Sequence, residues 1–127
     1  MKLLPLFALL LVCAGCNRDE ISMGHPEYAR ALTDGGDPYK GRERIMNYGC
    51  AGCHTIPGIP DADATVGPQL DRLAHRTYLA GVVKNTPDNM MRWIQDPPGV
   101  DPMTAMPKLN VSESDARDIA SYLYTLK

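Results

Sequence analysis

The clearest periodic pattern of the chain lies near its C-terminal end. Apolar residues recur there at spacings of three, four and three, at Ala116, Ile119, Leu123 and Leu126, which is the repeat of one buried helix face. The preceding run Ser-Glu-Ser-Asp at residues 112–115 resembles a capping box, in which the serine side chain accepts a hydrogen bond from the helix backbone. The pattern therefore predicts a helix that begins after the serine and buries one face.

An earlier helix is predicted from a capping residue followed by proline at the first helical position. Asp37-Pro38 supplies this pair, and residues 39–48 continue the helix with Ile45 and Met46 directed inward. Gly49 ends it.

The same opening recurs at Thr86-Pro87, with an acidic residue in the first turn. This helix is predicted to run through Ile94 and to stop before the proline pair at 97–98. A short helical turn is expected over residues 69–74, with Leu70 and Leu73 inward. No alternating apolar pattern of useful length predicts a strand, so the expected class is all-α.

Residues 1–15 are typical of an export signal, with Lys2 at the start, an apolar run over residues 3–12 and small residues just before Cys16. The apolar run is about half as long as a membrane-spanning helix requires. Its Ala-Gly-Cys ending resembles the bacterial lipoprotein signal, although Cys13 stands where an aliphatic residue is usual. We therefore expect Cys16 to be acylated and to anchor the protein in a membrane. Ordinary cleavage near this point is the alternative.

The mature chain is predicted to have two parts. Residues 16–36 are polar, contain glycine and proline and lack sustained periodicity, so they are interpreted as a flexible tether. His25 is interpreted as a solvated residue within it. Residues 37–127 then form one domain, which is small for a self-sufficient core, so that a buried cofactor would contribute to the fold.

The charge of the chain excludes one class of partner. The full sequence has 13 Lys and Arg against 15 Asp and Glu. Residues 1–15 contain only one of these charges, on Lys2, so the mature chain keeps 12 positive and 15 negative side chains, a net charge of −3. We see no basic stripe, and no nucleic-acid partner is expected.

The motif with the most specific chemistry is Cys50-Ala-Gly-Cys53-His54. Two cysteines two residues apart, with histidine directly after the second, indicate a c-type haem attachment site. The two thiols would add to the vinyl groups of one haem c, and the histidine would ligate the iron. The alternatives are a redox CxxC pair, which needs a βαβ context, and half of a zinc site, which needs a second pair of ligands.

A second iron ligand is expected from elsewhere in the chain. Met106 is the preferred candidate because it lies in a non-helical loop bounded by prolines between the last two helices, where a side chain can approach the cofactor face opposite His54. Ligation by histidine and methionine raises the reduction potential and suits an electron carrier. The other candidates are Met103, Met90, Met91 and His75. Met46, Met90 and Met91 are interpreted as core residues, and His75 as a residue that lies at the surface or supports a ligand without binding the iron.

These motifs together resemble the class I cytochrome c family. The resemblance covers the whole mature domain and rests on Gly-Asp-Pro-Tyr-Lys-Gly at 36–41, Gly-Cys-Ala-Gly-Cys-His-Thr-Ile-Pro-Gly at 49–58, Val-Gly-Pro-Gln-Leu at 66–70, Met-Pro at 106–107 and Ala-Arg-Asp-Ile-Ala-Ser-Tyr-Leu at 116–123. It implies a small single-domain fold in which the N- and C-terminal helices pack around a covalently bound haem. The crossing of these helices would lie at Gly41 and Ile45, near Tyr122 and Leu123.

The resemblance also implies roles for three further residues. Pro68 would offer its carbonyl oxygen to the ring N–H of His54. Arg76 would meet a haem propionate, and Trp93 would lie near the methionine side of the pocket. The alternatives are that Pro68 only shapes a turn, that Arg76 is solvated and that Trp93 is an ordinary core residue.

We therefore expect a monohaem electron carrier rather than an enzyme, held as a lipoprotein on the periplasmic side of a bacterial membrane. It would take electrons from a quinol-oxidising complex or a dehydrogenase and deliver them to a terminal oxidase. The likeness is to membrane-associated bacterial cytochromes c and to the cytochrome c domain of haem-copper oxidase subunits. The alternatives are a fixed haem subunit of a larger redox complex and a ligand-binding or peroxidase-like haem protein.

Overall fold

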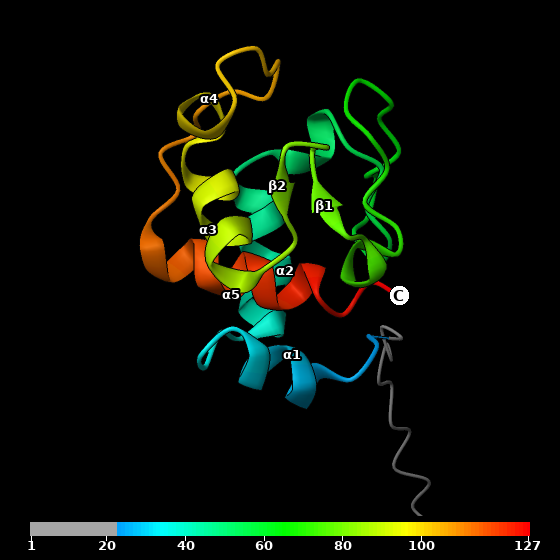
Figure 1. Ribbon diagram of the computed structural model, residues 1–127. Helices are drawn as coiled ribbons and strands as arrows, with labels where there is room; N and C mark the ends of the chain where they lie inside the picture. Colours follow the sequence, from blue (N-terminus) through cyan, green and yellow to red (C-terminus); the bar gives the residue numbers. More distant parts are fainter. Residues whose placement is uncertain (1–22) are drawn as a thin grey trace, which may run out of the picture.

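The computed structural model describes residues 23–127, and the predicted signal over 1–15 and the predicted lipid site Cys16 lie outside the described residues. The described part is helical apart from one small hairpin (Figure 1). The helices are α1 (Pro26–Leu32), α2 (Pro38–Asn47), α3 (Pro87–Gln95), α4 (Pro97–Val100) and α5 (Glu113–Leu123), and the antiparallel strands are β1 (Tyr78–Leu79) and β2 (Val83–Lys84). None of these helices is long and apolar enough to cross a membrane.

The crossing of α2 and α5 forms the framework of the fold. A Cβ atom on Gly41 would overlap the backbone carbonyl of Asp118, so only glycine lets the two helices approach this closely. Ile45 and Tyr122 are each 1% exposed beside this contact. The predicted all-α fold and its helix crossing are confirmed.

The predicted helix caps are present. The Asp37 carboxylate accepts a hydrogen bond from the Tyr39 backbone N–H at 2.9 Å, and the Ser112 hydroxyl accepts one from the Asp115 N–H at 3.1 Å. The Asp115 side chain instead accepts from the Tyr48 hydroxyl at 2.8 Å and pairs with Arg44 Nε at 2.9 Å. This carboxylate therefore ties the end of α2 to the start of α5.

Met46 is not a core residue, contrary to the sequence interpretation. It is 40% exposed, whereas its neighbour Ile45 is buried. Successive helix positions are about 100° apart, so the face that buries Ile45 turns Met46 toward solvent. Met90 is buried and Met91 is partly buried, as expected.

The β1–β2 hairpin and the one-turn helix α4 were not predicted. The strands β1 and β2 have two residues each, which is too short for an alternating pattern to appear in the sequence. The proline pair ends α3 as predicted, but Pro97 also occupies the first position of the one-turn helix α4.

The tether prediction is wrong for residues 26–36. Residues 26–32 form α1, in which Ala29 is fully buried, and the following Thr33 is 1% exposed. The Ser121 hydroxyl of α5 donates a hydrogen bond to the Gly36 carbonyl at 3.0 Å. A seven-residue helix is too short to show periodicity, and its partner α5 is distant in sequence, so local patterns could not reveal this packing. His25 is exposed, as expected, but it directly precedes α1.

Candidate functional site

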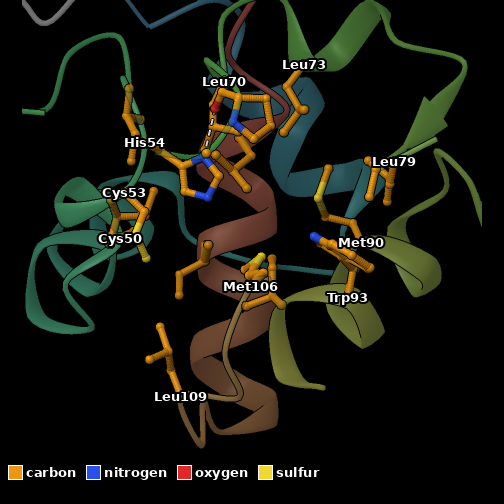
Figure 2. Close-up of a pocket in the computed structure, with 18 of the residues that line it drawn as sticks. Cys50, Cys53, His54, Leu70, Leu73, Leu79, Met90, Trp93, Met106 and Leu109 are labelled. Carbon is orange, nitrogen blue, oxygen red and sulfur yellow. Dashed lines mark hydrogen bonds between the residues drawn. The ribbon is translucent and has the colours of Figure 1, made fainter. Parts of the chain in front are cut away.

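An apolar cavity of about 370 Å³ opens between α2, α3, α5 and the loops that connect them. Figure 2 shows side chains from these separate segments directed into one space. The apolar walls are formed by Ile45, Ile56, Leu70, Leu73, Leu79, Met90, Ile94, Leu109, Val111, Ile119 and Leu123. Such a space suits a large hydrophobic ligand.

The Cys-Ala-Gly-Cys-His motif forms one edge of the cavity. Gly49, in the left-handed conformation with φ of 75°, ends α2, and a 3-10 turn over Cys50–Gly52 follows. The Cys50 carbonyl accepts hydrogen bonds from the backbone N–H groups of Cys53 at 3.2 Å and His54 at 3.1 Å. This tight turn brings both sulfur atoms and the imidazole to the same cavity.

The orientation of His54 is fixed by a backbone carbonyl. Its Nδ1 lies 2.7 Å from the Pro68 carbonyl oxygen. Because a carbonyl only accepts, Nδ1 donates its N–H there, and in the neutral ring this tautomer leaves the lone pair on Nε2. Figure 2 shows this Nε2 on the side of the ring that faces the cavity and Met106. A neutral, oriented imidazole of this kind is what a metal ligand requires.

Gly67 is a site residue whose role the sequence analysis missed. Its backbone N–H donates to the Cys53 carbonyl at 2.7 Å, and the N–H of Leu70 donates to the Thr55 carbonyl at 2.9 Å. These bonds hold residues 66–70 against the imidazole so closely that a Cβ on Gly67 would lie 2.5 Å from His54 Cε1. The Val-Gly-Pro run was noted in the sequence, but a single glycine does not reveal this close approach, which the fold creates.

The loop over residues 101–107 places its two methionines, Met103 and Met106, in different surroundings. Asp101 accepts a hydrogen bond from the Met103 N–H at 3.0 Å, and the Thr104 hydroxyl accepts one from the Met106 N–H at 3.1 Å. With the backbone turned in this way, Met106 lines the cavity while Met103 is 90% exposed. Of the other ligand candidates, Met90 belongs to the wall, and His75 is exposed and does not line the cavity.

Arg76 and Trp93, to which the resemblance gives roles beside the haem, both line the cavity. The Arg76 Nη2 donates to the backbone carbonyls of Gln69 at 2.5 Å and Asp71 at 3.0 Å, and it lies 3.5 Å from the Asp71 carboxylate. The guanidinium group thus closes the 69–76 loop at the cavity. Trp93, from α3, is half-buried.

Asn85 and Tyr124 brace this loop from outside the cavity, and neither was singled out from the sequence. The Asn85 amide donates to the carbonyls of Leu73 at 2.9 Å and Arg76 at 2.8 Å, and its oxygen accepts from the Tyr124 hydroxyl at 2.8 Å. The Ala74 N–H donates to the Leu126 carbonyl at 3.0 Å. The end of the chain therefore holds the loop that presents Arg76.

The state of the thiols bears on the redox CxxC alternative. Cys50 and Cys53 are free, and burial raises the pKa of the Cys50 thiol. A redox-active pair instead depends on a lowered thiol pKa.

Among residues 23–127 no three His, Cys, Asp or Glu side chains lie close enough to share a metal ion, which leaves a zinc site without its ligand set in that part of the chain. Two thiols, an oriented imidazole, a thioether and an apolar slot together fit a haem group.

The fold and this donor set define a haem-binding electron-transfer domain. The sequence model of the cytochrome c family matches residues 39–127. The chain therefore belongs to the cytochrome c family, whose cofactor is haem c.

Three curated relatives are similar to this chain, and each is described as cytochrome c oxidase subunit 2. The protein of Alkalihalophilus pseudofirmus is 32% identical over 89 residues, that of Bacillus sp. strain PS3 28% over 89 residues, and that of Bacillus subtilis 33% over 94 residues. The aligned regions cover 67–69% of this chain and 25–26% of each relative. The chain thus corresponds to about a quarter of the length of these proteins.

Proposed function

We propose that the protein is a monohaem electron carrier rather than an enzyme. The observation that carries this proposal is the placement of His54 and Met106 in one apolar cavity, with Nδ1 of the imidazole bonded to the Pro68 carbonyl and Nε2 facing the cavity. Cys50 and Cys53 would hold a single haem through thioether bonds, and His54 and Met106 would ligate its iron. The haem supplies an iron that changes between the ferrous and ferric states.

The surrounding residues would tune this centre. The Pro68 carbonyl keeps the imidazole in one tautomer and orientation and raises its strength as a ligand. Arg76 would pair with a propionate, because its guanidinium lines the cavity, and Trp93 would pack near the methionine side. The apolar walls keep water from the centre, which together with a thioether ligand favours a high reduction potential.

We further propose a respiratory role on the periplasmic side of a bacterial membrane. The support is the likeness to the three oxidase subunits and the export-type N-terminal sequence that ends at Cys16. Electrons would come from a quinol-oxidising complex or a dehydrogenase and pass to a terminal oxidase. Acyl chains on Cys16 would hold the protein at the membrane surface.

Carbon monoxide tests the carrier against a ligand-binding haem protein. If Met106 ligates the iron, the reduced wild type should bind the gas slowly or not at all. Met106→Ala should admit the gas and lower the reduction potential, because the thioether that favours ferrous iron is lost. Met103→Ala is the matched control and should behave as the wild type, since Met103 is 90% exposed. Rapid binding by the wild type would favour the ligand-binding function instead.

The membrane anchor has its own test. Cys16→Ser should leave an unprocessed precursor or release the protein into the soluble fraction, and mass spectrometry of the wild type should find an acylated N-terminal cysteine. An unmodified mature N-terminus would overturn the anchor while leaving the proposed electron transfer intact.

Co-purification of a terminal oxidase from the native membrane would distinguish a fixed subunit from a mobile carrier.

A further inference from the structure

We propose that residues 23–36, here called the α1 segment, hold the domain close against the membrane that anchors Cys16, with the haem cavity on the side of α5 away from this segment. The inference rests on the proposed lipid anchor. The α1 segment lies outside the part of the chain that matches the cytochrome c family, which begins at residue 39. None of its residues lines the cavity that the proposed function uses.

The α1 segment is built onto the domain at several points. Ala29 is fully buried, the Gly36 carbonyl accepts the Ser121 hydroxyl at 3.0 Å, and the Asp37 N–H that follows donates to the Asp118 carboxylate at 2.8 Å. A Cβ on Gly24 would lie 2.7 Å from the Thr125 carbonyl oxygen. Contacts at both ends and in the middle therefore make this segment part of the folded body.

The α1 segment and the haem cavity lie on opposite faces of α5. Ile119 and Leu123 line the cavity, whereas Ser121 and the Arg117 carbonyl face Gly36. Two residues along a helix correspond to a rotation of about 200°, so Ser121 points away from the cavity. Figure 1 shows α1 packed against α5 on the side away from α3 and α4, and no residue of the α1 segment lines the cavity.

Docking of this segment shortens the reach of the domain. Only residues 17–22 separate Cys16 from the described structure, and whatever conformation they adopt, Cys16 and Met23 are at most about 25 Å apart. A free chain from Cys16 to Asp37 would extend to about 75 Å. Because the maximum distance from the anchor is three times shorter, the volume that the domain can occupy is roughly 27-fold smaller. The domain is therefore concentrated at the membrane surface.

The exposed end of the α1 segment presents a tyrosine suited to a lipid surface. His25, Glu27 and Tyr28 surround a shallow hollow together with Pro26 and Lys127, and Tyr28 is 62% exposed. Tyrosine is enriched at the interface between membrane and water, where its ring meets the headgroups and its hydroxyl remains hydrated. We therefore assign this end to the phospholipid headgroups.

This arrangement specifies the kind of redox partner. The cavity is separated from the α1 segment by the full width of α5, so an electron donor or acceptor meets it above the bilayer rather than within it. The short reach requires that partner to be held at the same membrane. A membrane-bound complex with an extramembrane electron-entry domain fits both conditions, and a partner on a facing membrane does not.

The test uses the full-length lipidated holoprotein on phosphatidylethanolamine and phosphatidylglycerol vesicles that carry a headgroup fluorophore, which the haem quenches according to distance. The wild type should quench strongly. A 14-residue Gly/Ser insertion between residues 22 and 23 leaves the domain untouched and restores the longer reach, so quenching should fall at least about twofold. Ala29→Asp places a charge at a fully buried site and should release the segment with a similar loss of quenching.

Ala31→Asp is the matched control, since it makes the same change at an exposed position of the same helix and should quench as the wild type does. The visible haem spectrum reports whether the domain of the Ala29→Asp variant remains folded. If that variant is unfolded, the quenching of the insertion variant tests the proposal by itself. Wild-type quenching equal to that of the insertion variant would overturn the proposal with the anchor intact. Failure of the wild type to float with the vesicles would overturn the anchor and the proposal together.

Discussion

Gly67 and His54 are packed as closely as a residue without a side chain allows. A Cβ at Gly67 would lie 2.5 Å from Cε1 and 2.7 Å from Nδ1 of the imidazole. The next residue, Pro68, provides the carbonyl that accepts the ring N–H. One short segment thus sets both the position and the tautomer of the proposed iron ligand.

The first prediction concerns this contact. Gly67→Ala should displace the imidazole or residues 66–70 and lower the free energy of unfolding of the holoprotein by about 1–3 kcal/mol. The reduction potential should change with it, because the bond to the Pro68 carbonyl is disturbed. Gly52→Ala is the control: its Cβ would meet nothing within 4 Å, and its effect should stay within about 0.5 kcal/mol. A holoprotein with Gly67→Ala that matches the wild type in both measurements would contradict the assigned role.

The second prediction concerns the thioether bonds. Haem should stay with the wild-type polypeptide on a denaturing gel stained for haem, because Cys50 and Cys53 would both be bonded to it. Cys50→Ala or Cys53→Ala should lower the yield of holoprotein and its melting temperature together, since one covalent link is lost. Loss of haem from the wild-type band would exclude covalent attachment.

The third prediction uses the buried Tyr124 hydroxyl. Burial, with a smaller contribution from Tyr28, raises the pKa of Tyr124 to about 12. The folded state therefore favours the neutral phenol, and stability that is fully present below the unfolded pKa of about 10 is lost as the pH rises toward 12. The loss from this group is on the order of 3 kcal/mol.

Tyr124→Phe provides the measurement. At neutral pH it should cost about 1–2 kcal/mol, because the Asn85 side-chain oxygen loses the hydroxyl 2.8 Å away. Between pH 10 and 12 the variant should lose less stability than the wild type, so the difference between them should shrink. Denaturant unfolding at a series of pH values tests this, and a constant difference would contradict it.

The fourth prediction concerns acid. The hydrogen bond from Tyr48, aided by Ser112 and Arg44, lowers the pKa of Asp115 below its ordinary value of 3.8 against an opposing effect of burial. The folded state favours the carboxylate, so its stabilisation is present above about pH 4 and is lost as the pH falls through the lowered pKa. Asp115→Asn should be less stable at neutral pH and should show a shallower loss on acidification. An acid unfolding curve parallel to that of the wild type would argue against this linkage.

Local sequence determined the elements that depend on neighbouring residues. The caps at Asp37, Thr86 and Ser112 and the stop before the proline pair correctly placed the three longest helices, because each signal acts within one turn of the backbone. The attachment motif and the Met-Pro loop likewise identified Cys50, His54 and Met106, which the fold brings to one cavity. The family was recognisable from these motifs and is confirmed.

Only the tertiary structure decided what depends on contacts between distant segments. The α1 helix is stabilised by α5, about ninety positions later, and its own seven residues show no period. Asn85 braces the Arg76 loop because the chain end brings Tyr124 to it, and Gly67 is required because the fold presses residues 66–70 against His54. Such roles follow from the close packing of residues that are far apart in sequence, and no local pattern encodes them.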